Sequence, residues 1–180
     1  MLTILSLCDF SGIWSAPYRE AGYEVVRVDL RHGDDLRFFP ARPHRVQGVL
    51  CAPPCTEFAQ SGARWWKGKG EGPLLDNLAL VDACMRIVLV HEPRWWVLEN
   101  PVGRLNKWLG KPAMYFHPHE YGDPYTKKTA LWGKFAWPEP NPIEPIDDKR
   151  VHHAPDSHGR GYTRAETPPG FARAFFEANP

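Results

Sequence analysis

The chain has 180 residues, of which 43% are hydrophobic and 24% are charged, and its net charge is +1. This length and composition are typical of one globular domain, and they exclude a wholly disordered or fibrous protein. The near-neutral charge excludes a strong overall basic field, so a nucleic-acid partner has to be bound by a local patch. No apolar run approaches the roughly 18 residues of a membrane span, and the first residues lack the basic start of a secretory signal. We therefore expect no membrane partner.

The cysteine and proline contents indicate the redox environment of the protein and the presence of long irregular segments. Four cysteines (Cys8, Cys51, Cys55 and Cys84) are too few and too scattered for a disulfide scaffold, which predicts a reducing, cytoplasmic setting. The 19 prolines are about twice the usual share, and eight tryptophans accompany them. Together they indicate long irregular segments with aromatic rings at surfaces or ligand faces.

Apolar runs alternate with helix signals over the first hundred residues. Strands are expected at residues 2–7, 24–30, 47–52 and 95–99. Helices are expected at residues 17–21 and, after Pro73, over a long segment whose apolar residues recur at helical spacing: Leu74, Leu78, Val81, Met85 and Val88. This alternation predicts an α/β fold, with an open, mostly parallel sheet and ligands at the carboxyl ends of its strands.

The segments outside this alternation are less regular. A loop rich in glycine, tryptophan and lysine is expected from residue 53 to residue 72. The rest of the chain predicts a short helix at 102–109, strands at 115–119 and 129–135, a proline-rich loop at 138–164 and a closing helix at 171–178.

Three short strings lie near the ends of predicted strands, where an open α/β sheet gathers its ligand site. They are Phe10-Ser11-Gly12-Ile13-Trp14-Ser15, Pro54-Cys55-Thr56-Glu57-Phe58-Ala59 and Glu99-Asn100-Pro101. Each string alone is weak evidence, since a glycine turn, an inert buried thiol and a solvated glutamate are all common.

In this order, the three strings resemble motifs of the DNA cytosine-5 methyltransferases. That family has a cofactor turn Phe-x-Gly-x-Gly, a nucleophile in Pro-Cys-Gln-x-Phe-Ser and an acid in Glu-Asn-Val. The segment from Tyr121 to Trp132 looks like the basic segment of compact, phage-type members. The resemblance covers about residues 4–135, with a fainter match at 167–178. It implies a Rossmann-like, S-adenosylmethionine-dependent methyltransferase sheet with helices on both faces, in a bacterial or phage-infected cell.

The resemblance also implies a domain organisation. Residues 1–135 would form the catalytic domain, and residues 167–180 a C-terminal helix that packs back on it. Residues 136–166 are too few for the target-recognition domain that full-length members insert there, so we expect a proline-rich loop in its place. Recognition would then be weak, or would come from a separate specificity partner.

The resemblance implies that Cys55 is the nucleophile and Glu99 the acid, and the chemistry agrees with these residue types. Carbon 5 of cytosine becomes nucleophilic only after a thiolate adds to carbon 6 of the electron-poor ring. The charge that enters the ring is met by a proton at ring nitrogen 3, which a carboxylic acid with a raised pKa supplies. Glu99 follows the apolar run at residues 95–98, so desolvation is expected to raise its pKa.

S-adenosylmethionine is the cofactor that the resemblance implies. A close glycine turn and acids at strand ends are the features that such a nucleotide-like ligand requires. The candidate cofactor residues are Phe10, Ser11, Gly12, Ile13, Asp29, Leu30, Asp35 and Pro53, with Asp34 as the alternative to Asp35. The chain departs from the family pattern at Trp14 and Ser15, where a glycine pair is usual, and at Asp29, where glutamate is usual.

Two basic segments are candidates for contact with DNA. The loop after Cys55 interleaves cations, aromatic rings and glycines, and it suits closure over a flipped base and contact with phosphates: Arg64, Trp65, Trp66, Lys67 and Lys69. Lys127 is expected to contact DNA and Lys128 to act in the catalytic site. The alternatives are a solvated loop and an ordinary charged strand end.

No metal site is expected. His152, His153 and His158 lie near Asp156, but they lack the paired spacing of a structural zinc site. The leading hypothesis is transfer of a methyl group to carbon 5 of cytosine in DNA. Two others stay open: the same chemistry on a free nucleotide, a single strand or RNA, and a DNA-binding subunit that is non-catalytic or depends on a partner.

Overall fold

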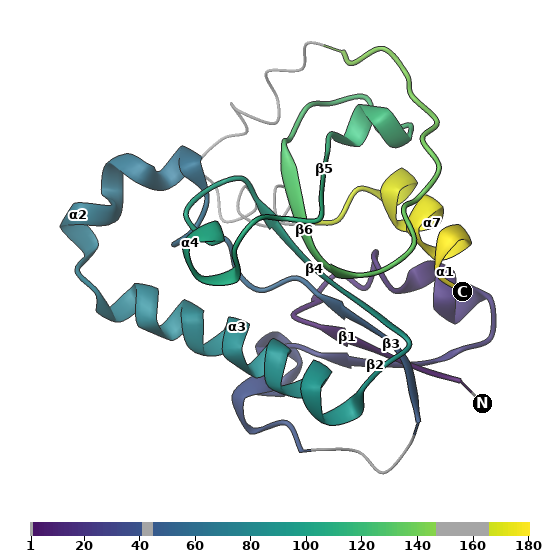
Figure 1. The fold of residues 1–180 in the computed structure, drawn as a ribbon, viewed down its shortest axis with the longest axis horizontal. Helices are drawn as coiled ribbons and strands as arrows, with labels where there is room; N and C mark the ends of the chain where they lie inside the picture. Colours follow the sequence, from purple (N-terminus) through teal and green to yellow (C-terminus); the bar gives the residue numbers. More distant parts are fainter. Residues whose placement is uncertain (1, 41–44, 147–165) are drawn as a thin grey trace.

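The computed structural model describes residues 2–40, 45–146 and 166–180 (Figure 1). Six strands form one sheet in the order β2-β1-β3-β4-β6-β5. Their bounds are β1 Thr3–Leu7, β2 Glu24–Val28, β3 Val46–Cys51, β4 Trp95–Pro101, β5 Met114–Phe116 and β6 Thr129–Lys134. Strands β1 to β4 are parallel to their neighbours in this set, whereas β6 is antiparallel to both β4 and β5.

The order of the strands places a ligand crevice in the sheet. The chain passes from β1 to β2 on one side and then returns to β3 on the other, so the connections diverge between β1 and β3. In open α/β sheets, ligands bind at such a switch point, outside the carboxyl ends of the strands. The residues that follow β1 and β3 are therefore placed to line a binding site.

Helices cover both faces of the sheet (Figure 1). The long helix α3 (Gly72–His91) packs on one face, where its Val81, Cys84 and Val88 join a core with Leu5 and Leu98. Helices α1 (Ala16–Glu20) and α7 (Pro169–Ala178) lie together on the other face. The predicted fold class is confirmed: an open, mostly parallel, Rossmann-like sheet with helices on both faces.

A second hydrophobic core lies under α1 and α7. Its aromatic members include Trp14, Tyr18, Phe116, Phe171 and Phe175. The rings of Phe116 and Phe171 stack with centroids 3.8 Å apart, and the Tyr18 hydroxyl donates to the carbonyl of Asn179 at 2.9 Å. Segments from the two ends of the chain therefore stabilise the same face of the sheet.

The irregular parts of the chain differ in detail from the expectations. The expected loop at 53–72 contains a 3-10 helix η3 (Gln60–Trp65) and a short helix α2 (Trp66–Lys69). The helix expected at 102–109 is only α4 (Asn106–Leu109). The strand expected at 115–119 ends at Phe116, because Pro118 has no N–H for a ladder and instead begins the 3-10 helix η4 (Pro118–Tyr121).

Part of the expected proline-rich loop can be located. Residues 136–146 contain no helix or strand, and residues 147–165 lie outside the described part of the chain. His152, His153, Asp156 and His158, which the sequence raised as metal-site candidates, fall there. In the described ranges, no helix has the length and apolar character needed to cross a bilayer.

Candidate active site

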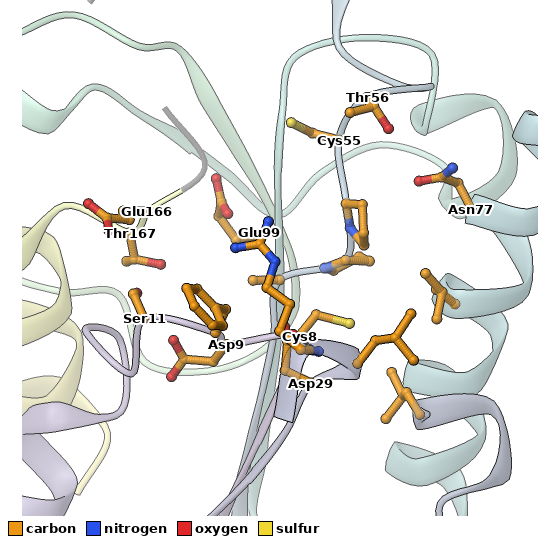
Figure 2. A pocket seen from close by; sticks show the side chains of 18 of the residues that line it. Cys8, Asp9, Ser11, Asp29, Cys55, Thr56, Asn77, Glu99, Glu166 and Thr167 are labelled. Atoms are coloured by element: carbon orange, nitrogen blue, oxygen red, sulfur yellow. Dashed lines mark hydrogen bonds between the residues drawn. The ribbon is translucent and has the colours of Figure 1, made fainter. Parts of the chain in front are cut away.

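A cavity of about 900 Å³ opens at the carboxyl ends of β1, β3 and β4 (Figure 2). Nine of the residues singled out from the sequence line it: Phe10, Ser11, Asp29, Leu30, Asp35, Pro53, Cys55, Glu99 and Lys127. The cavity wall does not include Gly12, Ile13, Lys128, Arg64, Trp65, Trp66, Lys67 or Lys69. The structure thus brings the cysteine, the glutamate and most of the expected cofactor residues to one place.

The turn after β1 is organised by Asp9, which the sequence analysis did not select. Its buried carboxylate accepts hydrogen bonds from the backbone N–H of Gly12 (2.9 Å) and from the hydroxyls of Ser6 (2.8 Å) and Ser15 (2.7 Å). Gly12 has φ +72°, in the left-handed region that favours glycine. The departure from the family pattern at Ser15 therefore has a structural role in this turn.

Trp14, the other departure, is also structural. Its side chain is 1% exposed and packs edge-on against Phe175 of α7. Phe10, by contrast, is exposed at the cavity, where its ring stacks on His32 and lies 4.4 Å from the Arg31 guanidinium carbon. The turn thus buries one aromatic ring in the core and presents another to the cavity.

Two carboxylates lie at the β2 side of the cavity, and both cap short 3-10 helices. Asp29 accepts from the backbone N–H of Arg31 at 2.9 Å, at the start of η1 (Leu30–His32). Asp35 accepts from the backbone N–H of Arg37, at the start of η2 (Leu36–Phe38), and also pairs with its guanidinium at 2.6 Å. The Arg37 hydrogen bonds lower the pKa of Asp35. Asp34 is exposed and does not line the cavity, so Asp35 is the better placed of the two.

The Cys55 side chain is half-buried on a tight turn beyond β3. The backbone carbonyl of Cys55 accepts hydrogen bonds from the N–H groups of Phe58 and Ala59, each at 2.9 Å. Phe58 is fully buried, and the amide of Asn100, at the end of β4, donates to the carbonyl of Pro53 at 2.9 Å. The turn that carries Cys55 is therefore attached to the strand that carries Glu99.

Glu99 lies within β4, and its side chain is buried. Burial raises the pKa of its carboxyl group, while the nearby charge of Lys127 opposes this shift. The Nζ atom of Lys127 is 3.8 Å from Glu99 Oε1, and this oxygen accepts no hydrogen bond from any described residue. Figure 2 shows Glu99 and Cys55 at the same cavity, with Asp29 below them. A buried carboxyl with an oxygen available to a ligand suits donation of a proton or a hydrogen bond.

The two neighbouring lysines of the basic segment have different surroundings. Lys127 faces Glu99 and the cavity, whereas Lys128 is exposed with its Nζ 5.2 Å from the centroid of the Tyr115 ring. The lysine beside the buried acid is therefore Lys127, whereas the lysine expected from the sequence to act in the catalytic site was Lys128. The two lysines directly precede strand β6, and successive side chains of a strand point to opposite faces.

In the basic segment after Cys55, some side chains face solvent and others contact the rest of the protein. Trp65 is 59% exposed, with the Arg64 guanidinium 5.0 Å from its ring, and Lys67 is exposed. Lys69, in contrast, forms an ion pair with the buried Glu57 (Nζ to Oε1, 2.5 Å). Trp66 packs against Arg104, whose guanidinium carbon lies 4.2 Å from its ring centroid. Part of this segment thus faces solvent and part of it supports the Cys55 turn.

Several contacts in the site escaped the sequence analysis. Glu57 and Arg104 lie 47 residues apart and meet only in the folded chain. Thr56, Asn77, Glu166 and Thr167 also line the cavity. The position of Asp9 directly before Phe10 was a readable signal, but no local pattern pointed to Arg104. Among the described residues, no three His, Cys, Asp or Glu side chains are grouped as metal ligands.

Comparisons with known proteins agree with this fold. No protein-family model matches the chain, and no curated protein matches it. A solved structure from E. coli, named as a "putative DNA modification methyltransferase encoded within prophage", is similar to it with a TM-score of 0.55 and 17% identity. The match covers 87% of this chain and 56% of that one, so the chain spans little more than half of its neighbour's length. The likeness shows that this chain and the E. coli protein share an α/β fold.

Proposed function

We propose that this protein is a DNA (cytosine-5) methyltransferase that acts through a covalent bond between Cys55 and cytosine. The observation that carries the proposal is the convergence of Cys55 and the buried Glu99 on one cavity, together with Phe10 and Asp29. The name of the E. coli structure supports the broader class, because that protein is described as modifying DNA.

The residues of the cavity are matched to the chemistry. The Cys55 sulfur adds to carbon 6 of the ring while Glu99 donates a proton or hydrogen bond to nitrogen 3, so carbon 5 becomes an enamine nucleophile. Burial favours the protonated form of Glu99 that this step requires. Lys127, beside Glu99, is placed to contact the polar edge of the base.

The cavity also fits S-adenosylmethionine. Its volume of about 900 Å³ lies within the usual range for cofactor sites, and its lining combines apolar residues with many polar and charged ones. Asp29 would accept from the ribose, Asp35 would face the adenine, and Leu30, Leu80 and Pro53 would supply apolar contacts. When bound, this cofactor supplies the methyl group.

The experiment is nucleoside mass spectrometry after incubation with S-adenosylmethionine and one of four substrates: duplex DNA, single-stranded DNA, RNA or a free cytidine nucleotide. We expect 5-methylcytosine in DNA from the wild-type protein. For Cys55→Ala we expect a loss of at least about a thousandfold, because no other route makes carbon 5 nucleophilic.

Covalent trapping provides a control within the same protein. DNA with 5-fluorocytosine should become bonded to Cys55, whereas Cys8, Cys51 and Cys84 should carry no adduct. Normal turnover by Cys55→Ala, or an adduct on another cysteine, would refute the assignment. Product in RNA or nucleotides alone would keep the chemistry and change the substrate, and activity only after addition of a cell extract would indicate a partner chain.

A further inference from the structure

The turn that carries Cys55 is attached at two places to the end of β4 and to the segment that follows it. The Asn100 amide donates to the Pro53 carbonyl at 2.9 Å, and the backbone N–H of Arg104 donates to the Phe58 carbonyl at 2.9 Å. The second of these bonds belongs to an antiparallel bridge between Ala59 and Gly103, in which the N–H of Gln60 also donates to the Val102 carbonyl at 2.9 Å. A Cβ atom on Gly103 would collide with the backbone of Phe58, so the two segments approach too closely for any larger residue.

Arg104 adds side-chain contacts to this junction. Its Nε donates to the Glu57 carbonyl at 2.6 Å, and its Nη2 lies 3.7 Å from the Glu57 carboxylate. Glu57 is only 5% exposed and also binds Lys69, while the Arg104 guanidinium packs on the ring of Trp66. A buried charge with partners on both sides is costly to separate from either, so this cluster resists displacement.

Arg104 does not itself line the cavity. The structure assigns it a positioning role: Arg104 holds the turn of Cys55 at a set distance from Glu99 by binding Glu57 and the backbone beside it. This inference rests on the proposed function only for the chemical roles of Cys55 and Glu99. Its physical basis is that a displacement of about 1 Å between reacting groups can lower a rate by about a hundredfold.

The test compares Arg104→Met, Arg104→Lys and the control Arg94→Met. Arg94 is an exposed arginine just before β4, at the opposite end of the strand. The first measurement is the rate at which iodoacetamide alkylates Cys55, followed by peptide mass spectrometry. We expect an increase of at least about threefold in Arg104→Met, because the turn opens more often, and the wild-type rate in Arg94→Met.

The second measurement is steady-state methyl transfer. In Arg104→Met, kcat should fall by about ten- to a hundredfold while the KM for S-adenosylmethionine stays within about twofold, because the cofactor residues are not displaced. Arg104→Lys keeps the positive charge beside Glu57 but loses the planar guanidinium group. Its alkylation rate and its kcat should therefore lie between those of Arg104→Met and the wild type.

The outcomes separate this inference from the proposed function. A wild-type alkylation rate in a folded Arg104→Met protein would overturn the positioning role, whatever the substrate. Faster alkylation of Cys55 in a protein whose wild-type form methylates no DNA would support the positioning role and refute the proposed function. Should Arg104→Met fail to fold, the alkylation rate of Arg104→Lys against Arg94→Met decides the same question.

Discussion

The two sides of the cavity are built in different ways. At the side of β2, Asp29 and Asp35 each cap a 3-10 helix by accepting from the backbone N–H two residues further along the chain. At the cysteine side, the hydrogen bonds from Asn100 to Pro53 and from Arg104 to Glu57 each join residues 47 positions apart. The first side is organised by local contacts, and the second depends on the pairing of distant segments.

The two sides of the cavity therefore differ in how accurately their side chains have to be positioned. A carboxylate that accepts a hydrogen bond from a ribose hydroxyl tolerates small displacements, because hydrogen bonds form over a broad range of acceptor angles. A thiolate that must add to one ring atom tolerates much less, because a near-attack distance is required. The expected effects of substitutions therefore differ between the two sides in size and in the step that they affect.

After the loss of Cys55 itself, the largest effect is expected at the buried acid. Glu99→Gln keeps the shape but removes the acidic proton, so the rate of methyl transfer should fall by about a hundredfold or more. The affinity for S-adenosylmethionine, measured by calorimetry, should stay nearly unchanged. A Glu99→Gln protein with normal kcat would remove Glu99 from the chemistry.

The pKa of Glu99 also predicts how the activity depends on pH. Burial raises the pKa of Glu99 and the charge of Lys127 opposes this. Activity that needs the protonated carboxyl should therefore be lost as pH rises through the pKa of Glu99. In Lys127→Gln the pKa should rise further, so the alkaline limb of the kcat profile should move to higher pH. An alkaline limb that stays in place, or moves to lower pH, would contradict the assignment of Glu99 as the proton donor.

A smaller effect is expected on the side of the local caps. Asp29→Ala should weaken S-adenosylmethionine binding by about tenfold, the loss expected for one hydrogen bond to a charged group. Calorimetry measures this directly, and kcat at saturating cofactor should change little. Asp29→Asn is the matched control, since it keeps an oxygen that can cap Arg31 and removes only the charge. Full affinity in Asp29→Ala would place the ribose elsewhere.

The smallest effect concerns the basic segment, and here the structure sharpens the expectation. Three phosphate contacts by Arg64, Lys67 and Lys69 would give log affinity for DNA a slope of about −2.7 against log salt. Because Lys69 is engaged by Glu57, two contacts and a slope of about −1.8 are expected instead. Fluorescence anisotropy across a salt series measures the slope, and Lys67→Gln should reduce it by about 0.9. A slope of −2.7 or steeper would show that further cations contact DNA.

The sequence predicted the fold class, and it predicted that Cys55 and Glu99 lie together at one edge of the sheet, because both predictions depend on patterns within short segments. Alternating apolar runs and helices define the parallel sheet, and its topology places strand ends together. The strand expected at residues 95–99 differs from β4 only in that β4 continues past Glu99 to Pro101. Irregular segments were less predictable, and the 3-10 helices at Gln60–Trp65 and Pro118–Tyr121 were not expected from the sequence.

Short segments of the sequence are enough to place a cysteine, an acid and a glycine turn at or near the carboxyl ends of three strands of one sheet. Only the tertiary structure decided which lysine faces Glu99, which cations are engaged by Glu57, and how the Cys55 turn is held. Side-chain direction and ion pairing depend on residues that lie far apart along the chain. Their approach is a property of the packed sheet, in which β4 carries Glu99 and leads to Arg104 beside the turn of Cys55.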